Sequence, residues 1–257
     1  MQPRQDGGTR RDLIVEALQE GGEVRVSDLA DQFGVSEMTI RRDLEDLEER
    51  GGLRRVRGGA ISTISRSYNP PFQLRLTIGR DEKRRIGKLA ASFVEDGDAI
   101  VIDAGTTTIP LAEEIIDRRG ITVATPSLRI ASMLSERAEI RTLLTGGFAT
   151  PGEHSLVGEQ AEGLFGRYRF DTVFVTCGGV HPEVGITEYN LDDARVKRAI
   201  LDGAARRVVL ADHRKLDHVA FSVVCPPEGF DVLITGSEAE DSILRRLTEA
   251  GVEVLVA

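Results

Sequence analysis

The sequence contains only two cysteines and has no long apolar run. Cys177 and Cys225 stand in apolar, strand-like surroundings and are not in a CxxC spacing, which is typical of a protein without disulfides. Neither an apolar stretch of 18 residues nor a signal peptide is visible, so a membrane-spanning helix and export are not expected. We therefore expect a reduced, cytoplasmic protein without a membrane partner.

Motifs for metal binding, nucleotide binding and nucleophilic catalysis are also missing. The four histidines show no HxxxH or Cys/His ligand spacing, so we expect structural roles for them and predict no metal site; they are His154, His181, His213 and His218. No Walker or GxGxxG pattern occurs, and no Ser or Cys has a His and a carboxylate at a recognisable spacing. We expect no catalytic residue and no cofactor.

Acidic residues are absent from one segment of an otherwise acidic chain. The formal net charge is −9, yet no Asp or Glu occurs between Arg50 and Arg80, where the basic residues are Arg50, Arg54, Arg55, Arg57, Arg66, Arg75 and Arg80. Residues 1–66 carry 11 Lys/Arg against 13 Asp/Glu, and the remainder carries 22 against 29. The basic charge is therefore local. A small basic patch favours a homodimer or homotetramer, which multiplies the contacts with a polyanion.

Three helices are predicted before residue 50. Thr9 and Asp12 suit a capping box for the first helix, which should end at Gly21-Gly22. Ser27 is a suitable N-cap for the second helix. Gly34 can end the second helix, and Ser36 can cap the third within two residues.

An apolar stripe in the third helix determines which of its residues point outward. Ile40, Leu44 and Leu47 follow one another at spacings of four and three, so they should pack inward. At about 100° per residue, the first turns then present the following residues to a DNA major groove: Ser36, Met38, Thr39, Arg41 and Arg42. The second half of the helix is strongly acidic and would be repelled by phosphates, so only the first turns can enter the groove.

A short basic hairpin follows this helix. Residues 53–57, Gly58-Gly59 and residues 60–61 have the pattern of two strands joined by a glycine turn. Its arginines should contact phosphates or the adjacent minor groove, and they are Arg54, Arg55 and Arg57. A helical pair with a glycine turn occurs in many folds and is weak evidence alone. The combination predicts a winged helix-turn-helix domain over residues 9–61 that binds double-stranded DNA.

The rest of the chain divides into a linker and a larger domain. Residues 62–78 contain Ser, Asn and two prolines with little apolar periodicity, which predicts a linker, and residues 1–8 suggest a disordered tail. From residue 79 to residue 257, helical patterns alternate with buried strands. This alternation predicts an α/β domain with a mostly parallel sheet, expected to sense an effector and to oligomerise.

Polar and glycine-rich segments follow the predicted strands of this domain, where ligands bind in open α/β sheets. Thr106–Thr108 would offer hydroxyls and amides to a phosphate at the start of the next helix, beside a flexible Gly105. Lys197 and Lys215 are candidate cations, and Asp103 and Asp212 would accept hydrogen bonds from sugar hydroxyls. The expected ligand residues are Asp103, Gly105, Thr106, Thr107, Thr108, Thr125, Ser127, Gly146, Gly147, Gly178, Gly179, Lys197, Asp212 and Lys215. Turn and capping needs explain any single loop, but five such loops together indicate a phosphate-bearing ligand.

The chain resembles the DeoR family of bacterial transcriptional regulators. The matching segments are VSEMTIRRDLEDLEERGGLRRVRGGA (35–60), IDAGTTT, TGG, SLVG (155–158), FDTVFV, GIT (185–187), DDARVK and ADHRK. The resemblance implies a sensor domain similar to ribose-5-phosphate isomerase. It also implies repression of a carbohydrate operon, relieved by a phosphorylated sugar or polyol. Carried over by position, the family's ligand loops fall on Asp103, Gly105, Thr106, Thr107, Gly146, Gly147, Lys197, Asp212 and Lys215.

Several positions depart from the family pattern. Pro126 stands where Asn is common, Thr176 where Gly is common, Arg214 where Ser is common and Gly236 where Asp is common. Pro126 has no amide donor and Arg214 adds a charge, so the ligand preference of this chain is expected to differ.

Two alternatives to a DNA-binding repressor stay open at this point. In the first, residues 79–257 isomerise a sugar phosphate, with Asp103 or Asp192 as the base and Lys197 as its electrostatic partner. The DNA-reading segment argues against this enzyme. In the second, the protein is a nucleic-acid scaffold without a small ligand, and the strand-end residues can be changed freely.

Overall fold

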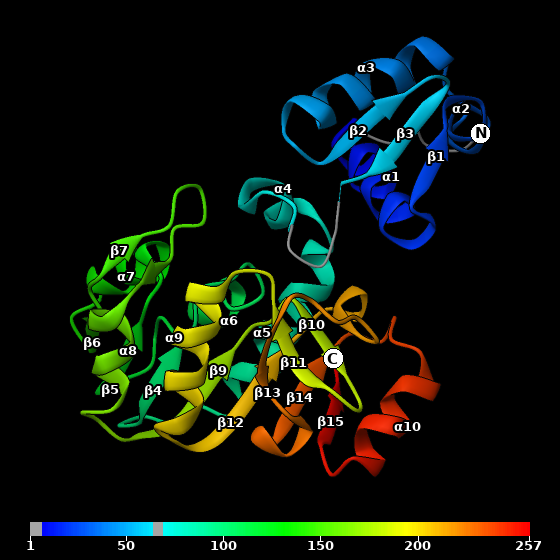
Figure 1. Ribbon diagram of the computed structural model, residues 1–257. Helices are drawn as coiled ribbons and strands as arrows, with labels where there is room; N and C mark the ends of the chain where they lie inside the picture. Colours follow the sequence, from blue (N-terminus) through cyan, green and yellow to red (C-terminus); the bar gives the residue numbers. More distant parts are fainter. Residues whose placement is uncertain (1–6, 64–68) are drawn as a thin grey trace. The chain divides into compact units, whose positions relative to one another are not determined.

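The computed structural model describes residues 7–63 and 69–257 and divides into two compact units, Met1–Arg80 and Asp81–Ala257 (Figure 1). We call these units the head and the sensor unit. Most of the predicted N-terminal tail (residues 1–6) and residues 64–68 of the predicted linker, Arg66 included, lie outside the described residues. In the portion of the chain that the structure describes, no helix combines the length and apolarity needed to cross a membrane.

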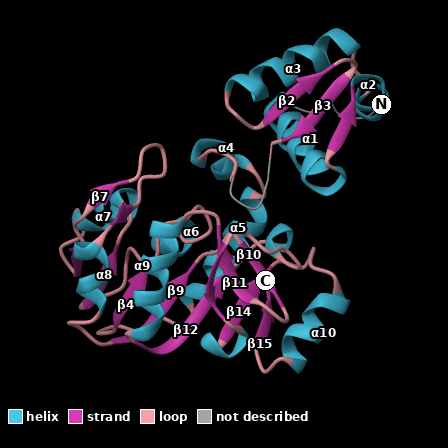
Figure 2. Ribbon diagram, in the orientation of Figure 1, coloured by secondary structure: helices cyan, strands magenta, loops and turns pink. Residues whose placement is uncertain are grey.

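The described part of the head contains helices packed on one small antiparallel sheet (Figure 2). The helices are α1 (Gly7–Gly21), α2 (Val26–Phe33), α3 (Glu37–Glu49) and α4 (Phe72–Thr77). The strands are β1 (Glu23–Arg25), β2 (Leu53–Val56) and β3 (Gly59–Ser62), in the order β1-β3-β2. The β2–β3 hairpin turns at Gly58, whose φ of +84° favours glycine. This architecture confirms the predicted winged helix-turn-helix.

The apolar stripe of α3 is buried, as predicted. Ile40, Leu44 and Leu47 are 0%, 1% and 1% exposed and belong to the hydrophobic core of the head. The turn before α3 also agrees with the prediction. Gly34 ends α2 in the left-handed conformation, and Ser36 accepts a hydrogen bond from the backbone N–H of Thr39 at 3.2 Å. The outward direction of the first turn of α3 is thus determined by packing behind it.

Two predicted helix starts are wrong. Helix α2 begins at Val26, so Ser27 lies inside its first turn and does not cap it. The reason is tertiary, because the Val26 N–H donates to the carbonyl of Gly58 in the hairpin turn at 2.9 Å. Helix α1 begins at Gly7, which places Thr9 within the helix instead of at its N-cap.

The expected linker over residues 62–78 is corrected at both ends. Ser62 is the last residue of β3, and residues 72–77 form α4. Leu74 and Ile78 are 5% and 3% exposed and pack into the head core. A Cβ atom at Gly52 would lie 2.5 Å from Cδ2 of Leu74, so α4 packs tightly against the head. Because two prolines precede this short apolar segment, the sequence pattern indicated a linker and not a helix.

A parallel sheet of seven strands forms the centre of the sensor unit. In spatial order its strands are β15 (Glu253–Val256), β14 (Val232–Thr235), β12 (Ala204–Leu210), β9 (Phe170–Val175), β4 (Ala99–Ile102), β5 (Ile121–Thr125) and β6 (Ile140–Leu144). The helices are α5 (Arg80–Ala91), α6 (Ile109–Glu114), α7 (Leu128–Ser135), α8 (Glu159–Phe165), α9 (Leu191–Asp202) and α10 (Asp241–Glu249). The predicted α/β class is confirmed.

Short antiparallel elements supplement this sheet. Strands β10 (Gly179–His181), β11 (Gly185–Glu188) and β13 (Ser222–Cys225) form a small second sheet. Strands β7 (Phe148–Ala149) and β8 (Leu156–Val157) pair as a hairpin, and 3-10 turns cover His213–Lys215 and Pro227–Gly229. Several of these elements follow the carboxyl ends of the main strands, where they extend the loops that carry the predicted ligand residues.

The strand order reverses between β4 and β9. From β4 the chain adds β5 and β6 on one side, then crosses to β9 and adds β12, β14 and β15 on the other. The carboxyl ends of β4 and β9 are adjacent, since the Asp103 N–H donates to the Phe174 carbonyl at 3.0 Å. In open α/β sheets, ligands bind at such a switch point. The fold therefore singles out the residues just after β4 and β9.

Truncating the stripe of α3 tests the packing of the head. We expect Leu44→Ala to lower the free energy of unfolding of the head by about 2–5 kcal/mol, because it leaves a cavity in a core that this side chain fills. Urea unfolding of the full chain measures the change. Met38→Ala, at an exposed position of the same helix, is the control and should change stability by less than about 0.5 kcal/mol. Equal effects of the two substitutions would contradict the inward orientation.

Candidate DNA-binding face and ligand site

The first turns of α3 present a short polar surface. Met38 is 60% exposed and Arg42 is exposed, on the side opposite the buried stripe. Among the described residues, no ion pair involves Arg42, whereas Arg41 pairs with Glu37 at 3.0 Å one turn earlier. The Thr39 hydroxyl lies 2.9 Å from that of Ser36 and belongs to the cap. Arg42 and Met38 are thus the most available of the predicted groove residues.

The β2–β3 hairpin is the wing of the head. Its strand register places the arginines of β2 on two faces of the small sheet. Val24, Ala60 and Arg55 occupy one cross-strand row, and the adjacent row contains Glu23, Ile61 and Arg54. Ala60 is fully buried, so the first row faces the helices and the second faces away. Arg55 therefore points toward α3, while Arg54 points away from it.

Arg55 is held by the acidic face of α3. Its backbone N–H donates to Glu48 at 2.8 Å, its Nε donates to Glu48 at 3.0 Å, and its Nη1 donates to Glu45. The predicted direct role on phosphates does not fit this geometry, because the guanidinium already has carboxylate partners. Arg54 and Arg57 are exposed and have no ion pair within the described residues. Arg25, which the sequence analysis missed, is exposed opposite Gly59 beside the hairpin turn.

Two further acidic residues of α3, Asp43 and Asp46, are also paired inside the head. Asp43 is 7% exposed and accepts a hydrogen bond from Arg10 Nε at 2.6 Å. Asp46 accepts from Arg11 and, at 3.0 Å, from Arg50. The sequence predicted that this half of α3 would repel phosphates, but arginines from α1 and from the end of α3 compensate much of its charge. No local sequence pattern indicated that arginines of α1 would pair with these aspartates.

A buried ion pair occupies the switch point of the sensor sheet. Asp103, just after β4, is 2% exposed, and Lys197 of α9 is 3% exposed. The Lys197 ammonium donates to Asp103 and lies 3.5 Å from Glu188. Asp103 also accepts from the backbone N–H and the hydroxyl of Thr176, each at 3.0 Å. The structure thus brings together two predicted residues and adds Thr176 and Glu188, which were not predicted as ligand residues.

These contacts keep the lysine charged. Burial alone would lower the pKa of Lys197, but the carboxylates of Asp103 and Glu188 outweigh it and raise that pKa. The site therefore holds one ammonium between two carboxylates, with hydroxyls beside them. A polar ligand entering here would have to exchange with these partners.

The loop after β4 is explained largely by packing. A Cβ atom at Gly105 would lie 2.4 Å from Oγ1 of Thr176, so the glycine accommodates a neighbouring loop. The Thr108 hydroxyl donates to the carbonyls of Asp103 and Gly105. Helix α6 has only six residues, which makes it a weak source of the dipole expected for a phosphate. Thr106 and Thr107 are 7% and 6% exposed beside this loop.

Turn and capping needs also account for the predicted residues after β5, β6 and β9. Ser127 caps α7 by accepting from Ile130, and Thr125 accepts from the Ser127 N–H at 3.0 Å. The glycines Gly146, Gly147, Gly178 and Gly179 either have positive φ or would clash if a side chain were added. For Gly147 and Gly179 the nearest obstacles are backbone carbonyls at 2.3 Å. These positions are structurally required whether or not a ligand is present.

A second buried cluster surrounds Asp212 at the end of β12. Asp212 is 3% exposed, accepts from Arg214 Nε at 2.8 Å and lies 3.9 Å from Lys83 Nζ of α5. Burial would raise the pKa of Asp212, but Arg214, Lys83 and Lys215 outweigh it and lower that pKa. The Lys215 ammonium lies 5.3 Å from the ring centre of Tyr189. Lys83 was not predicted, because it precedes β12 by more than a hundred residues.

Asp193 is a further site residue that the sequence analysis missed. It accepts a hydrogen bond from the Ser155 hydroxyl at 3.1 Å, which joins α9 to the loop before β8. Burial raises the pKa of Asp193 to about 6, with Glu188 and Asp103 adding to the effect and Lys197 opposing it. Its neighbour Asp192, considered above as a base, is exposed. The only signal was that Asp193 belongs to the DDARVK segment.

Comparison with known proteins identifies both units. A family model described as the DeoR-like helix-turn-helix domain matches residues 10–66, and one described as the DeoR C terminal sensor domain matches residues 79–237. The HTH-type transcriptional regulator GlpR of Haloferax volcanii is 32% identical over 96% of both chains. GolR of Listeria innocua, an HTH-type transcriptional regulator, is 30% identical over 96% of this chain and 98% of its own. The glycerol-3-phosphate regulon repressor of Escherichia coli K12 is 27% identical over 95% and 97%.

Solved structures show a weaker similarity. Ribose 5 phosphate isomerase A from Neisseria gonorrhoeae has 14% identity and a TM-score of 0.38, with 52% of each chain covered. The eIF2B beta subunit from Chaetomium thermophilum has 15% identity and a TM-score of 0.40, with 88% of this chain and 66% of its own covered. Similarity at this level supports no functional conclusion.

The raised pKa of Asp193 predicts a pH-dependent stability. Because the folded pKa of about 6 exceeds the ordinary value of 3.8, protonation of Asp193 stabilises the fold fully below about pH 4, and this contribution is lost as the pH rises through 6. Asp193→Asn should remove the loss, which is about 1–1.5 kcal/mol between pH 5 and pH 7.5. Urea unfolding at pH 5 and pH 7.5 measures it, with the exposed Asp192→Asn as the control. An unchanged pH dependence in Asp193→Asn would contradict the assignment.

Proposed function

The chain belongs to the DeoR family of DNA-binding transcriptional regulators, and from this we propose that it represses a carbohydrate catabolic operon and is released by a phosphorylated sugar or polyol. The observation that carries this proposal is the buried cluster of Asp103, Lys197 and Glu188 at the switch point of the sensor sheet. A relative of similar length, the glycerol-3-phosphate regulon repressor, controls genes named for a phosphorylated polyol.

We assign DNA reading to the first turns of α3. Met38, Thr39, Arg41 and Arg42 face the major groove, with Arg42 best placed to contact a base edge because no carboxylate in the described part of the chain pairs with it. Ser36 fixes the start of the helix through its cap. Groove entry from this end keeps the acidic half of α3 away from the phosphates.

The wing supplies contacts to the DNA backbone or the adjacent minor groove. Arg54 and Arg57 are the hairpin cations without an ion pair among the described residues, and Arg25 lies beside the hairpin turn. Arg55 positions the wing instead, since its ion pairs with Glu45 and Glu48 tie β2 to α3. The wing and the reading helix are therefore joined as one surface.

The effector site combines the predicted cations and carboxylates. Lys197, Lys215 and the added Lys83 would attract a phosphate, and Asp103 and Asp212 would accept hydrogen bonds from sugar hydroxyls. Thr106 and Thr107 border the same loop, and Thr125, Ser127 and the glycines Gly146, Gly147, Gly178 and Gly179 shape the surrounding loops. The ligand competes with existing ion pairs, so its binding changes the contacts between α9, β4 and β9.

We propose that the protein acts as a homodimer or homotetramer. One head offers few uncompensated cations, so two heads on two half-sites are needed for tight operator binding. An effector that binds better to the DNA-free conformation then releases the operator.

An isomerase is the less favoured alternative, because the matched families and relatives are regulators. Asp103 is held by Lys197 and Thr176, and Asp192 is exposed, so neither is poised as a general base. A scaffold without a small ligand predicts free substitution of the strand-end residues. A panel of phosphorylated sugars and polyols distinguishes such a scaffold from an effector-released repressor.

Two arginine substitutions test the DNA-binding face. Arg42→Ala should weaken binding to the preferred duplex by about 1–3 kcal/mol and relax the preference at one base pair. Arg57→Ala should weaken all duplexes alike and reduce the slope of log affinity against log salt by about 1. Fluorescence anisotropy with a duplex selected by the full chain from a random pool measures both. Parent-like binding by both variants would remove the groove assignment.

A ligand panel tests the effector site. Phosphorylated sugars and polyols that bind should raise the unfolding temperature of the full chain and release the selected duplex, whereas their unphosphorylated counterparts should do neither. Lys215→Ala should abolish both effects, and Lys88→Ala, at an exposed lysine of α5, should preserve them. Operator affinity that no saturating member of the panel changes would contradict our proposal and favour the scaffold.

A further inference from the structure

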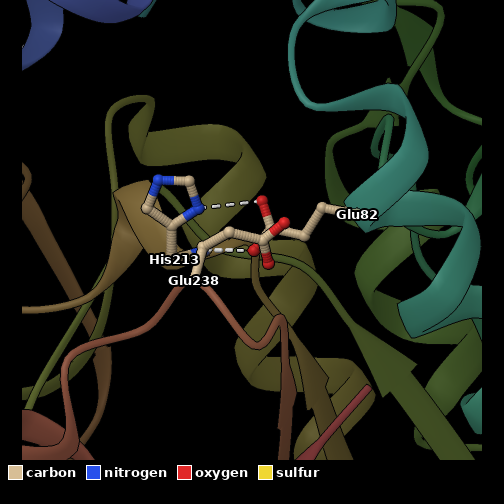
Figure 3. Close-up of side chains that lie close together, drawn as sticks. All are labelled: Glu82, His213 and Glu238. Carbon is tan, nitrogen blue, oxygen red and sulfur yellow. Dashed lines mark hydrogen bonds and ion pairs between the residues drawn. The ribbon is translucent and has the colours of Figure 1, made fainter.

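A cluster of one histidine and two glutamates, none of them assigned to the effector site, lies next to the Asp212 cluster (Figure 3). Glu82 comes from α5, His213 from the 3-10 turn after β12, and Glu238 from the segment after β14. One ligand atom from each residue lies within 4.8 Å of the other two. The three residues are far apart in sequence, which is why ligand spacing gave no sign of them and no metal site was predicted.

The geometry points to a binding site for a divalent transition-metal ion, such as Zn²⁺, Mn²⁺ or Co²⁺, formed by Glu82, His213 and Glu238. His213 Nδ1 and Glu82 Oε2 lie 2.9 Å apart. Two neighbouring ligands at about 2.0–2.2 Å from one ion have a similar separation, so the ion takes the place of the shared proton. Figure 3 shows the carboxyl groups of Glu82 and Glu238 meeting on the same side of the imidazole.

The donor set selects the class of ion. One imidazole nitrogen with two carboxylates suits the first-row transition metals, whereas Mg²⁺ and Ca²⁺ prefer sites made wholly of oxygen. Glu82 is 4% exposed and its other oxygen accepts from the His213 backbone N–H at 2.7 Å. This second hydrogen bond orients the carboxylate while Oε2 binds the ion. Glu238 is exposed, so the site opens to solvent on its side.

A glycine makes room for the two carboxylates. A Cβ atom at Gly236 would lie 2.3 Å from Glu82 Oε1 and 2.6 Å from Glu238 Oε2. Any side chain at this position would push the carboxylates apart.

Two arginines compete with the ion. Arg85 holds Glu238 through Nη2 at 2.6 and 2.7 Å, and Arg214 Nη2 lies 3.9 Å from Glu82. The Arg85 side chain is 41% exposed, so its guanidinium can move into water when the ion binds. Arg85 therefore lowers the affinity of the site without being part of it. Removing this guanidinium should tighten metal binding, a result that a purely structural hydrogen-bond cluster would not produce.

Co²⁺ is the probe for this site in the full chain, freed of metal by chelator and without a histidine tag. We expect Co²⁺ to give visible absorption bands and Zn²⁺ to abolish them, with one ion per chain by calorimetry. Glu238→Gln and His213→Gln should weaken Co²⁺ binding at least tenfold, and Arg85→Ala should strengthen it several-fold. His181→Gln, which removes another histidine near a carboxylate, is the matched control and should bind like the parent. Mg²⁺ should not compete.

The half-buried His213 and the exposed Glu238 keep the test decisive even where a variant of buried Glu82 fails to fold. Parent-like Co²⁺ binding in both His213→Gln and Glu238→Gln would overturn the proposal, as would the absence of any Co²⁺ binding by the parent. Weaker Co²⁺ binding in Arg85→Ala would also contradict it. None of these results depends on the effector or on the operator, so they leave the proposed function untouched.

Discussion

The buried pair of Lys197 and Asp103 is the interaction on which the organisation of the sensor unit depends. An unpaired charge at this depth would destabilise the fold by several kcal/mol, so α9 must lie where its lysine reaches the loop after β4. Thr176 and Glu188 complete the coordination of this pair and join β9 and β11 to it. The same groups are those that a polar ligand would need. In the function that we propose, structural and sensing roles use one set of atoms, so binding of the effector changes the contacts that hold the unit together.

Charge compensation also explains how a head with as many acidic as basic residues can bind DNA. Arg10, Arg11, Arg50 and Arg55 are paired with the acidic residues of α3. In the described part of the head, Arg42 on α3 and Arg54 and Arg57 on the wing have no carboxylate partner. The net charge of the unit is thus a poor guide to its surface potential, because attraction to phosphates depends on which charges lack a nearby partner.

Glycines after strands show how a sequence pattern can have two causes. Gly105, Gly147 and Gly179 suggested close approach of a ligand, and the structure shows close approach of Thr176 or of neighbouring backbone instead. Both causes require the same small residue, so the pattern alone could not separate them. Asp103, Lys197 and Asp212 were predicted on better grounds, since a buried charge at a strand end needs a chemical partner. Their partners Glu188 and Lys83 carried no comparable local signal.

Local periodicity and turn chemistry determined most of the helices and strands of both units, whereas the start of α2 and the helix α4 depended on tertiary contacts. They also determined the inward stripe of Ile40, Leu44 and Leu47 and, through it, the outward face of α3. Tertiary packing decided everything that depends on distant partners, such as the packing of α1 on α3, which pairs Arg10 with Asp43, and the strand order of the sensor sheet, which brings Glu82 to His213. The physical reason is range, because helix caps and apolar spacing act over a few residues. A charged side chain instead pairs with whichever opposite charge the completed fold places beside it.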